Sequence, residues 1–323
     1  MSNVKFPSYN RSSLSEQLPL KTPAVIAIEA SSRCCFNCYY CYQTLLDDKD
    51  RFTQDLNLDI FKKIVRDACE FENQIDTLVF ARFGEPLINK HIGQMVRIAK
   101  QSNQFKQIKI ITNAFLLKDE MKEALLDAEL DVLEVSLQAL GEDEYEKITG
   151  VRVDPETILE DLAKIKEQST HIKIALKIFS DHISAEDPRL KQIESMVDSL
   201  IIEDIIDLDN GCERFLSKRG NNRKICSQPF YTINIDSSGN IIPCCGDVRG
   251  ELSKFNAKDM SIYNYWNGED LRSFQIRLLK GYVPRVCSIC KGAQIYSPRG
   301  CELDTESYSI LERLERRSGD VRD

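Results

Sequence analysis

Three cysteines near the N-terminus have the spacing of ligands that share one metal centre. Cys34, Cys38 and Cys41 form a Cys-x3-Cys-x2-Cys pattern within eight residues. Structural zinc prefers a closed set of four ligands, and a four-iron cluster is as a rule also held by four thiolates. A set of three therefore leaves one coordination position open for a substrate or a cofactor.

A second group of four cysteines lies toward the C-terminus. Cys226 and Cys244 are followed, after a long gap, by the Cys-x2-Cys pair Cys287 and Cys290. A hairpin predicted over residues 231–244 returns Cys244 toward Cys226, and the later pair completes four thiolates. This closed set suits zinc or an iron–sulfur cluster, and spacing alone does not choose between them.

The composition is that of a soluble globular protein. The 323 residues include 12 cysteines and 3 histidines, and 43 basic against 51 acidic side chains give a net charge of −8. Because no apolar run of signal-peptide length occurs near the N-terminus, we expect a cytoplasmic protein whose thiols bind metal. The acidic balance argues against nucleic acid as the main partner, and we expect no membrane partner.

Strands and helices alternate through the first two thirds of the chain. Short β-branched runs predict strands, and helical spacing of apolar residues predicts the helices between them. Such alternation implies an α/β protein with a parallel sheet, open or curled into a partial barrel, and ligands then belong at the carboxyl ends of the strands. The predicted strands cover residues 24–30, 77–80, 108–112, 132–136, 172–179 and 201–206, and the predicted helices 58–68, 92–98, 118–128, 155–167 and 193–200.

The first cysteine set and the motifs after it resemble the radical S-adenosylmethionine (radical SAM) superfamily. Tyr40 precedes the third cysteine, and Gly84-Glu85-Pro86 after the second strand is similar to the family's Gly-Glu-Pro motif. Thr112-Asn113 after the third strand and Ser136-Leu137-Gln138 at the fourth are similar to two further segments of the family. Phe83 and Ala114 stand where glycine is common, and Gln138 replaces an aspartate.

This resemblance implies a partial (β/α)6 TIM-like barrel that carries a [4Fe-4S] cluster with S-adenosylmethionine (SAM) at its open iron. The cluster ligands would be Cys34, Cys38 and Cys41. The implied contacts with SAM are Tyr40, Gly84, Glu85, Pro86, Thr112, Asn113, Ser136 and Gln138. Of these, Glu85 and the backbone of its motif would hold the methionine amino group of SAM.

The second cysteine set resembles the SPASM/twitch extension of radical SAM enzymes, which binds auxiliary four-iron clusters. The full SPASM version continues with further cysteines, but Tyr296 and Gly300 occupy those places here. The resemblance therefore implies one auxiliary [4Fe-4S] cluster on Cys226, Cys244, Cys287 and Cys290, while structural zinc remains the alternative. We expect an N-terminal extension over residues 1–23, a radical SAM core over 24–210, a SPASM/twitch domain over 211–303 and a C-terminal helix or tail over 304–323.

The activity implied by the resemblance is reductive cleavage of SAM to a 5′-deoxyadenosyl radical that abstracts a hydrogen from the substrate. One auxiliary cluster suits electron uptake during oxidation of a sugar or aminocyclitol carbinol, with a flavodoxin- or ferredoxin-type protein as reductant. The alternative is epimerisation or crosslinking of a ribosomally made peptide, in which Cys212, Cys245 or Cys301 would return a hydrogen atom. A third hypothesis is an iron–sulfur electron carrier or sensor, although a carrier has no use for an open iron.

Overall fold

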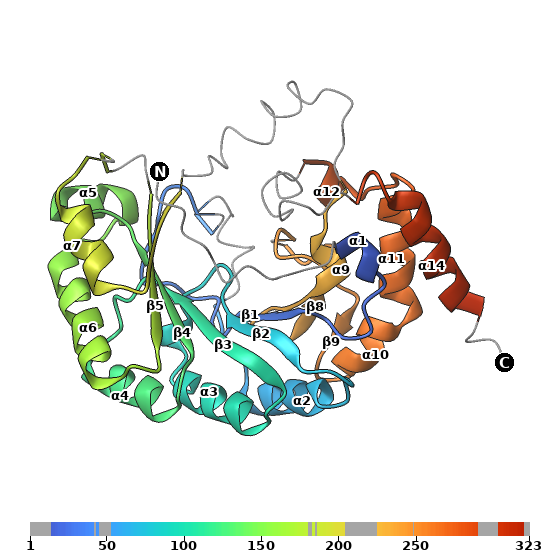
Figure 1. Cartoon of the computed structure of the whole chain (residues 1–323), viewed down its shortest axis with the longest axis horizontal. Coiled ribbons are helices and arrows are strands. Elements are labelled where there is room, and N and C mark those ends of the chain that lie inside the picture. Colours follow the sequence, from blue (N-terminus) through green and yellow to red (C-terminus); the bar gives the residue numbers. More distant parts are fainter. Residues whose placement is uncertain are drawn as a thin grey trace.

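The structure is a computed structural model, and it describes residues 14–41, 43–44, 53–179, 183–184, 186–203, 225–247, 249–289 and 303–319. One curved sheet runs through this part of the chain in the order β6-β5-β4-β3-β2-β1-β7-β8-β9 (Figure 1). Strands β1 to β6 pair in parallel, as predicted, and the sheet is open because β6 and β9 are its edges. These six strands are β1 (Val25–Ile28), β2 (Ile75–Phe80), β3 (Phe105–Thr112), β4 (Val132–Leu137), β5 (Lys173–Phe179) and β6 (Ser199–Glu203).

Amphipathic helices cover the outer face of the parallel strands (Figure 1). In α2, residues Phe61, Ile64, Val65 and Ala68 recur at helical spacing and are all buried, so this stripe packs on the sheet. The side chain of Asn57 caps the start of the helix by accepting hydrogen bonds from two backbone N–H groups. The helices of this half are α2 (Leu58–Ala68), η2 (Pro86–Ile88), α3 (Ile92–Gln101), α4 (Asp119–Asp127), α5 (Glu142–Thr149), α6 (Pro155–Gln168) and α7 (Arg189–Met196).

The C-terminal part extends the same sheet. Strand β7 (Thr232–Ile235) pairs in parallel with β1, and β8 (Asn240–Ile242) and β9 (Phe255–Asn256) continue in antiparallel order. The predicted hairpin is therefore confirmed. The pairing of β7 with β1 joins it to the core sheet, so the two cysteine regions belong to one continuous structure. The helices of this part are α9 (Gln228–Tyr231), α10 (Ile262–Asn267), α11 (Glu269–Leu279), α12 (Arg285–Ile289) and α14 (Ser307–Gly319).

The two ends of the described chain meet in a second, smaller core. Leu14 and Leu18, in and just after the short helix α1 (Leu14–Gln17), pack in one apolar cluster with Ile310 and Leu314 of α14. The Nε of Arg313 donates to the carbonyl oxygen of Leu18 at 2.7 Å. The N-terminal segment is thus held against the C-terminal helix. None of the helices in the described residues is long and apolar enough to cross a membrane.

The structure corrects one predicted helix. The apolar run beginning at Ile193 predicts a helix over residues 193–200, but α7 spans Arg189–Met196. Ser199 and Leu200 instead start β6, where they pair with Ala175 and Leu176 of β5, so backbone pairing with the sheet overrides the helical periodicity. The sixth strand accordingly begins two residues earlier than predicted and is described as far as Glu203, and the predicted strand residues 204–206 lie outside the described residues.

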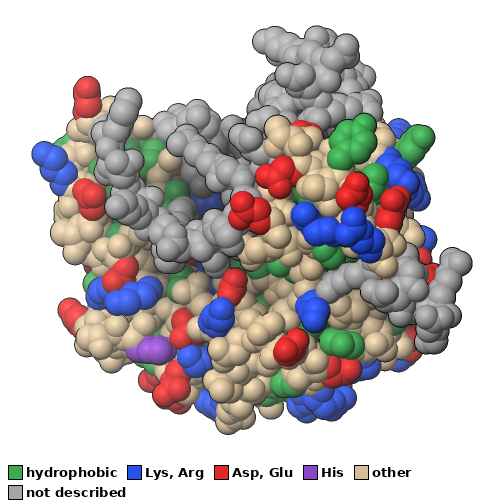
Figure 2. Space-filling model, turned by 45° about the vertical axis from the view of Figure 1, so that its right-hand side comes forward, with side chains coloured by type: hydrophobic (Ala, Val, Ile, Leu, Met, Phe, Trp, Pro, Cys, Tyr) green, Lys and Arg blue, Asp and Glu red, His purple; other side chains and the backbone are tan. Residues whose placement is uncertain are grey.

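Acidic and basic side chains alternate over the face drawn in Figure 2, with no continuous patch of one sign visible there. Ion pairs are formed between separate elements of the chain, such as the pair of Lys280, just after α11, with Glu315 of α14 at 2.9 Å. Exposed pairs of this kind contribute little to stability.

Candidate functional site

The predicted site segments meet at the carboxyl edge of the parallel sheet. The cysteine loop follows β1, the Gly84-Glu85-Pro86 segment follows β2, and Asn113 follows β3. Parallel strands end at the same edge of a sheet, where ligands of open α/β folds bind. The fold therefore brings together residues that are far apart in the sequence, such as Cys34 and Asn113, which are 79 positions apart, and Tyr40 and Gln138, which are 98 positions apart.

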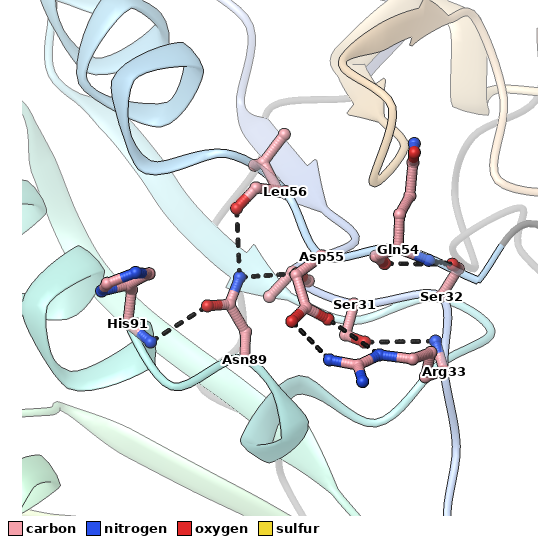
Figure 3. Close-up of polar contacts among 9 residues, drawn as sticks. Ser31, Ser32, Arg33, Gln54, Asp55, Leu56, Asn89 and His91 are labelled. Atoms are coloured by element: carbon pink, nitrogen blue, oxygen red, sulfur yellow. Dashed lines mark hydrogen bonds and ion pairs between the residues drawn. The ribbon is translucent and has the colours of Figure 1, made fainter.

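The start of the cysteine loop is fastened to the segment before α2 (Figure 3). Ser32 and Gln54 exchange hydrogen bonds through the Ser32 hydroxyl and the two backbones at 3.0–3.1 Å. The guanidinium of Arg33 forms an ion pair with Asp55. The Nδ2 of Asn89 donates to the carbonyl oxygens of Ala30 at 2.8 Å and Leu56 at 3.2 Å. These contacts fix the direction in which the chain leaves β1.

The C-terminal end of α5 holds the middle of the cysteine loop. The backbone N–H groups of Asn37 and Tyr39 donate to the last carbonyl oxygens of this helix, on Thr149 at 2.8 Å and Ile148 at 3.1 Å. Such carbonyls have no partner within a helix, so the loop satisfies them. Helix α5 was not predicted from the sequence, so its role in holding the ligand loop was missed with it.

Aromatic rings pack around the loop. The ring of Phe36 lies 5.4 Å from that of Phe115 and 5.8 Å from that of Tyr145. The ring of Tyr40 lies 5.1 Å from that of Phe179 at the end of β5, and its hydroxyl donates to Oε1 of Gln138. The structure thus places Tyr40 and Gln138, two residues predicted to contact SAM, in direct contact near the ends of β4 and β5.

The thiols of the first set lie in a partly buried cluster. Burial, followed by the charges of Cys41 and Cys34, raises the pKa of the Cys38 thiol to about 12. The hydrogen bond with Cys35, followed by burial, raises the pKa of Cys34. Nδ2 of Asn113 donates to Cys34 Sγ at 3.8 Å and to Cys35 Sγ at 3.4 Å. Cysteine thiolates are the usual ligands of iron–sulfur clusters, so the donor type of Cys34, Cys38 and Cys41 fits a cluster.

Gly84 is required by close packing against the start of the loop. A Cβ atom at this position would lie 1.8 Å from the carbonyl oxygen of Ser31. The next residue, Glu85, donates its backbone N–H to the carbonyl oxygen of Arg33 at 2.8 Å. The segment after β2 is therefore pressed against the residues that lead directly into Cys34, and a side chain there would push them apart.

The carboxylate of Glu85 is buried, with 2% of the residue exposed, and accepts three hydrogen bonds. Oε1 accepts from the Thr112 hydroxyl at 2.6 Å and from the backbone N–H of Leu87 at 3.0 Å, and Oε2 accepts from the backbone N–H of Asn113 at 2.9 Å. Burial raises the pKa of Glu85, while these hydrogen bonds oppose the rise. In this structure Glu85 caps η2 before Pro86 and holds the end of β3 in place. Its predicted contact with SAM remains a prediction.

The segment after β3 turns sharply. Ala114 has a φ of 58°, in the region that favours glycine, and it stands where the family commonly has glycine. The Thr112 hydroxyl accepts from the Ala114 backbone N–H at 2.9 Å, and Oδ1 of Asn113 accepts from that of Phe115 at 3.0 Å. The turn aims the Asn113 amide at the cysteine loop. At the end of β4, Nε2 of Gln138 donates to the carbonyl oxygen of Ser136 at 3.1 Å.

Part of the second cysteine set is brought together. Hydrogen bonds with the thiols of Cys226 and Cys245 lower the pKa of Cys244 well below its usual range. The backbone N–H of Gly246 also donates to Cys244 Sγ at 3.2 Å. Cys287 lies in α12. Cys290 and the suggested hydrogen donors Cys212 and Cys301 lie outside the described residues, and Cys245 lies beside the set.

Three or more His, Cys, Asp or Glu side chains placed to ligate one metal ion are not found among the residues that the structure describes. The thiol set around Cys244 nonetheless has the chemistry of a cluster site, because thiolates are the usual ligands of iron–sulfur clusters.

Comparison with known proteins extends this description. The sequence model of the radical SAM superfamily matches residues 28–179, and that of the SPASM iron–sulfur cluster-binding domain matches residues 226–291. GTP 3′,8-cyclase of Staphylococcus haemolyticus (strain JCSC1435) is 27% identical over 154 residues, which are 47% of this chain and 45% of the relative. That of Chlorobaculum tepidum is 32% identical over 129 residues, 40% of this chain and 37% of the relative. The chain thus spans less than half the length of these relatives.

Solved structures share the fold at low sequence identity. BtrN in complex with AdoMet and 2-DOIA matches with a TM-score of 0.55 and 17% identity, over 83% of this chain and 91% of that one. Streptococcus suis SuiB bound to precursor peptide SuiA matches with a TM-score of 0.62 and 17% identity, over 90% of this chain and 76% of that one. The chain thus contains a radical SAM domain over residues 28–179 and a C-terminal SPASM domain over residues 226–291, and these domains indicate a [4Fe-4S] cluster with SAM together with auxiliary cluster binding.

Proposed function

We propose that this radical SAM enzyme oxidises a carbinol of a sugar or aminocyclitol and uses one auxiliary cluster as the electron acceptor. The observation that carries the proposal is the single set of four spaced cysteines in the C-terminal part, Cys226, Cys244, Cys287 and Cys290, with Tyr296 and Gly300 where a full SPASM domain has further ligands. The fold match over 91% of BtrN, whose complex contains 2-DOIA, supports a small-molecule substrate.

In this proposal the residues at the sheet edge have separate tasks. Cys34, Cys38 and Cys41 hold the first cluster, which when loaded supplies the electron that cleaves SAM. Glu85 and Asn113 bind or orient the methionine end of SAM. Tyr40, Ser136 and Gln138 bind its adenosine end, and the aromatic packing behind the loop excludes water from the radical.

In this reaction the auxiliary cluster accepts the second of the two electrons that the substrate loses. A carbinol that becomes a ketone loses two electrons and two protons. One electron leaves with a hydrogen atom that converts the 5′-deoxyadenosyl radical to 5′-deoxyadenosine. The second proton goes to a base, and the second electron goes to the auxiliary cluster. A flavodoxin- or ferredoxin-type protein is the reductant that supplies the electron for SAM cleavage, and its oxidised form takes the second electron from the auxiliary cluster.

The first test is anaerobic reconstitution with iron and sulfide, followed by iron counting and measurement of 5′-deoxyadenosine formed from SAM and dithionite. We expect about eight irons per chain, because two four-iron clusters are proposed, together with 5′-deoxyadenosine. About four irons with product would contradict the auxiliary cluster, and no product would favour the carrier or sensor hypothesis.

A substrate test distinguishes oxidation from peptide modification. Aminocyclitols carrying deuterium at the carbinol carbon are expected to transfer deuterium to 5′-deoxyadenosine and to yield a ketone. The peptide alternative is supported by the fold match to SuiB over 90% of this chain. It predicts instead that a peptide gains solvent deuterium or a crosslink, and that replacing a hydrogen donor such as Cys245 stops epimerisation.

A further inference from the structure

Arg82 reaches from the core to the loop of the second cysteine set. It follows β2, two residues before Gly84, and its Nη2 donates to the carbonyl oxygen of Asp247 at 2.6 Å. The residues in this contact are 165 positions apart in sequence. The short segment after β2 therefore touches both cysteine regions, because Glu85 in the same segment bonds to Arg33 before the first set.

The turn that Arg82 contacts is the one that carries Cys244. The backbone N–H of Asp247 donates to the carbonyl oxygen of Cys244 at 3.3 Å, and that of Gly246 donates to the Cys244 sulfur. The Asp247 carboxylate closes the other side of the turn by accepting from the backbone N–H groups of Glu251 at 2.9 Å and Leu252 at 2.8 Å. A guanidinium bonded to this turn is thus held close to the thiol of Cys244.

The arginine is held in an unfavourable state. Its φ of 137° lies in the region that favours glycine, and its Nε is buried and has no hydrogen-bond partner within the described part of the chain. Its Cζ lies 4.9 Å from the centroid of the Phe83 ring. Strained backbone of this kind persists only where the surroundings fix it, and it is concentrated at functional sites.

The charge of Arg82 is not paired with a carboxylate within the described residues. The acidic groups near its guanidinium are Glu29 and Asp247. The Glu29 carboxylate accepts from the backbone N–H groups of Phe83 at 3.4 Å and Ser237 at 3.1 Å, and that of Asp247 accepts from Glu251 and Leu252. The guanidinium instead bonds to the carbonyl oxygen of the turn that carries Cys244.

We propose that Arg82 is a positioning residue of the auxiliary cluster, which fixes the Cys244–Asp247 turn and raises the reduction potential of that cluster. The inference rests on the proposed function in one respect, that the second cysteine set holds the cluster. A reduced cluster carries one more negative charge than an oxidised one, so a fixed cation beside it stabilises the reduced form. The effect would favour uptake of the electron that the substrate gives up.

The test is a redox titration of the auxiliary cluster alone, followed by electron paramagnetic resonance. The full-length chain with Cys34, Cys38 and Cys41 replaced by Ala leaves the second set as the remaining proposed cluster site. In this background we expect Arg82→Gln to shift the midpoint potential to more negative values, and Arg82→Lys to shift it less because the charge is kept. Arg82→Gly removes the charge but relieves the positive φ, so it gives the same shift without a strained backbone.

Arg272→Gln is the matched control. Arg272 also has a buried nitrogen without a partner in the described residues, and it donates to a backbone carbonyl oxygen, that of Asn267 at 3.1 Å. We expect the midpoint potential of the Arg272→Gln variant to equal that of the chain in which only Cys34, Cys38 and Cys41 are replaced. If the Arg82 variants also had this midpoint potential, the inference about Arg82 would be overturned. A background protein without any cluster signal would overturn the auxiliary site itself, and the inference with it.

Discussion

The two cysteine sites are built in opposite ways. Cys34, Cys38 and Cys41 come from one loop, and burial together with neighbouring thiols raises the pKa of Cys38 to about 12. Cys226, Cys244 and Cys287 come from separate segments, and the pKa of Cys244 is lowered by hydrogen bonds from Cys226 and Cys245 and by Arg82. The first site is thus one loop held against the core sheet, whereas the second joins separate segments around a turn that Arg82 contacts.

This difference suits the tasks that we propose for the two clusters, in which the first gives an electron to SAM and the second accepts one from the substrate. The buried Glu85 carboxylate lies beside the first loop, where its Oε2 accepts from the backbone N–H of Asn113, whereas the Arg82 guanidinium bonds to the turn of the second set. A cation near the second cluster would stabilise its reduced form. The charges beside the two loops would thus favour electron flow in the proposed direction.

The largest expected effect is loss of SAM cleavage when the first site is removed. Replacing Cys34, Cys38 and Cys41 together by Ala should abolish formation of 5′-deoxyadenosine while leaving about half of the iron, because each proposed cluster holds four irons. Chromatography of the reaction mixture and iron analysis check this. Cleavage at the rate of the unmodified chain would break the comparison, since the sites would then be wrongly assigned.

Removing the second site should have a smaller and different effect. Cys287→Ala with Cys290→Ala should keep part of the SAM cleavage but block net oxidation of the substrate, because the electron acceptor is lost. The ratio of ketone to 5′-deoxyadenosine measures this. Full turnover by the double variant would remove the auxiliary cluster from the mechanism.

Gly84→Ala tests how tightly the first loop is packed. Its Cβ would meet the Ser31 carbonyl oxygen, which is backbone and cannot rotate away, so we expect unfolding free energy to fall by about 3 kcal/mol. Urea unfolding under anaerobic conditions measures the change. Gly141→Ala is the control, because its Cβ would have 3.7 Å to the nearest atom; we expect a change below about 1 kcal/mol. If Gly84→Ala and Gly141→Ala changed the unfolding free energy equally, the loop before Cys34 would be able to move away from the added Cβ atom.

Glu85→Gln is expected to cost about 1–2 kcal/mol, because an NH2 group replaces an oxygen that accepts a hydrogen bond. Burial raises the folded-state pKa of Glu85, so the folded chain binds this proton more readily than the unfolded chain. The contribution to stability is therefore full below the unfolded pKa of about 4.5 and falls as the pH rises through the raised pKa.

The urea midpoint should consequently fall less steeply with rising pH in Glu85→Gln than in the unmodified chain. Glu123→Gln changes an exposed glutamate on α4 and should leave the slope unchanged. If Glu85→Gln keeps the slope of the unmodified chain, another buried acid such as Glu29 causes it.

Local patterns carried most of what the sequence predicts. The β-branched runs placed β1 to β5 within a few residues, and Asp154 before Pro155 marked the start of α6, where its side chain accepts from the backbone N–H of Glu156. The Cys-x3-Cys-x2-Cys spacing was readable because one loop holds all three thiols. The open or curled alternatives for the sheet are settled by β6 and β9 at its edges.

Features that depend on distant contacts escaped prediction. Nothing in Thr232–Ile235 signals that this strand pairs with β1 on one side while it pairs with β8 of its own hairpin on the other. The contact of Arg82 with Asp247 depends on that pairing. Helix α5 was missed because its first turn consists of charged residues, Glu142, Asp143 and Glu144, and its apolar stripe is reduced to Tyr145 and Ile148.

The pairing of β7 with β1 has a consequence for synthesis of the protein. During translation β1 is paired on one side by β2 but exposes its other edge until residues 232–235 leave the ribosome. At about 5–20 residues per second, this edge stays open for on the order of ten seconds. Unpaired strand edges invite association with other chains, so we expect the nascent protein to need chaperone protection during this interval.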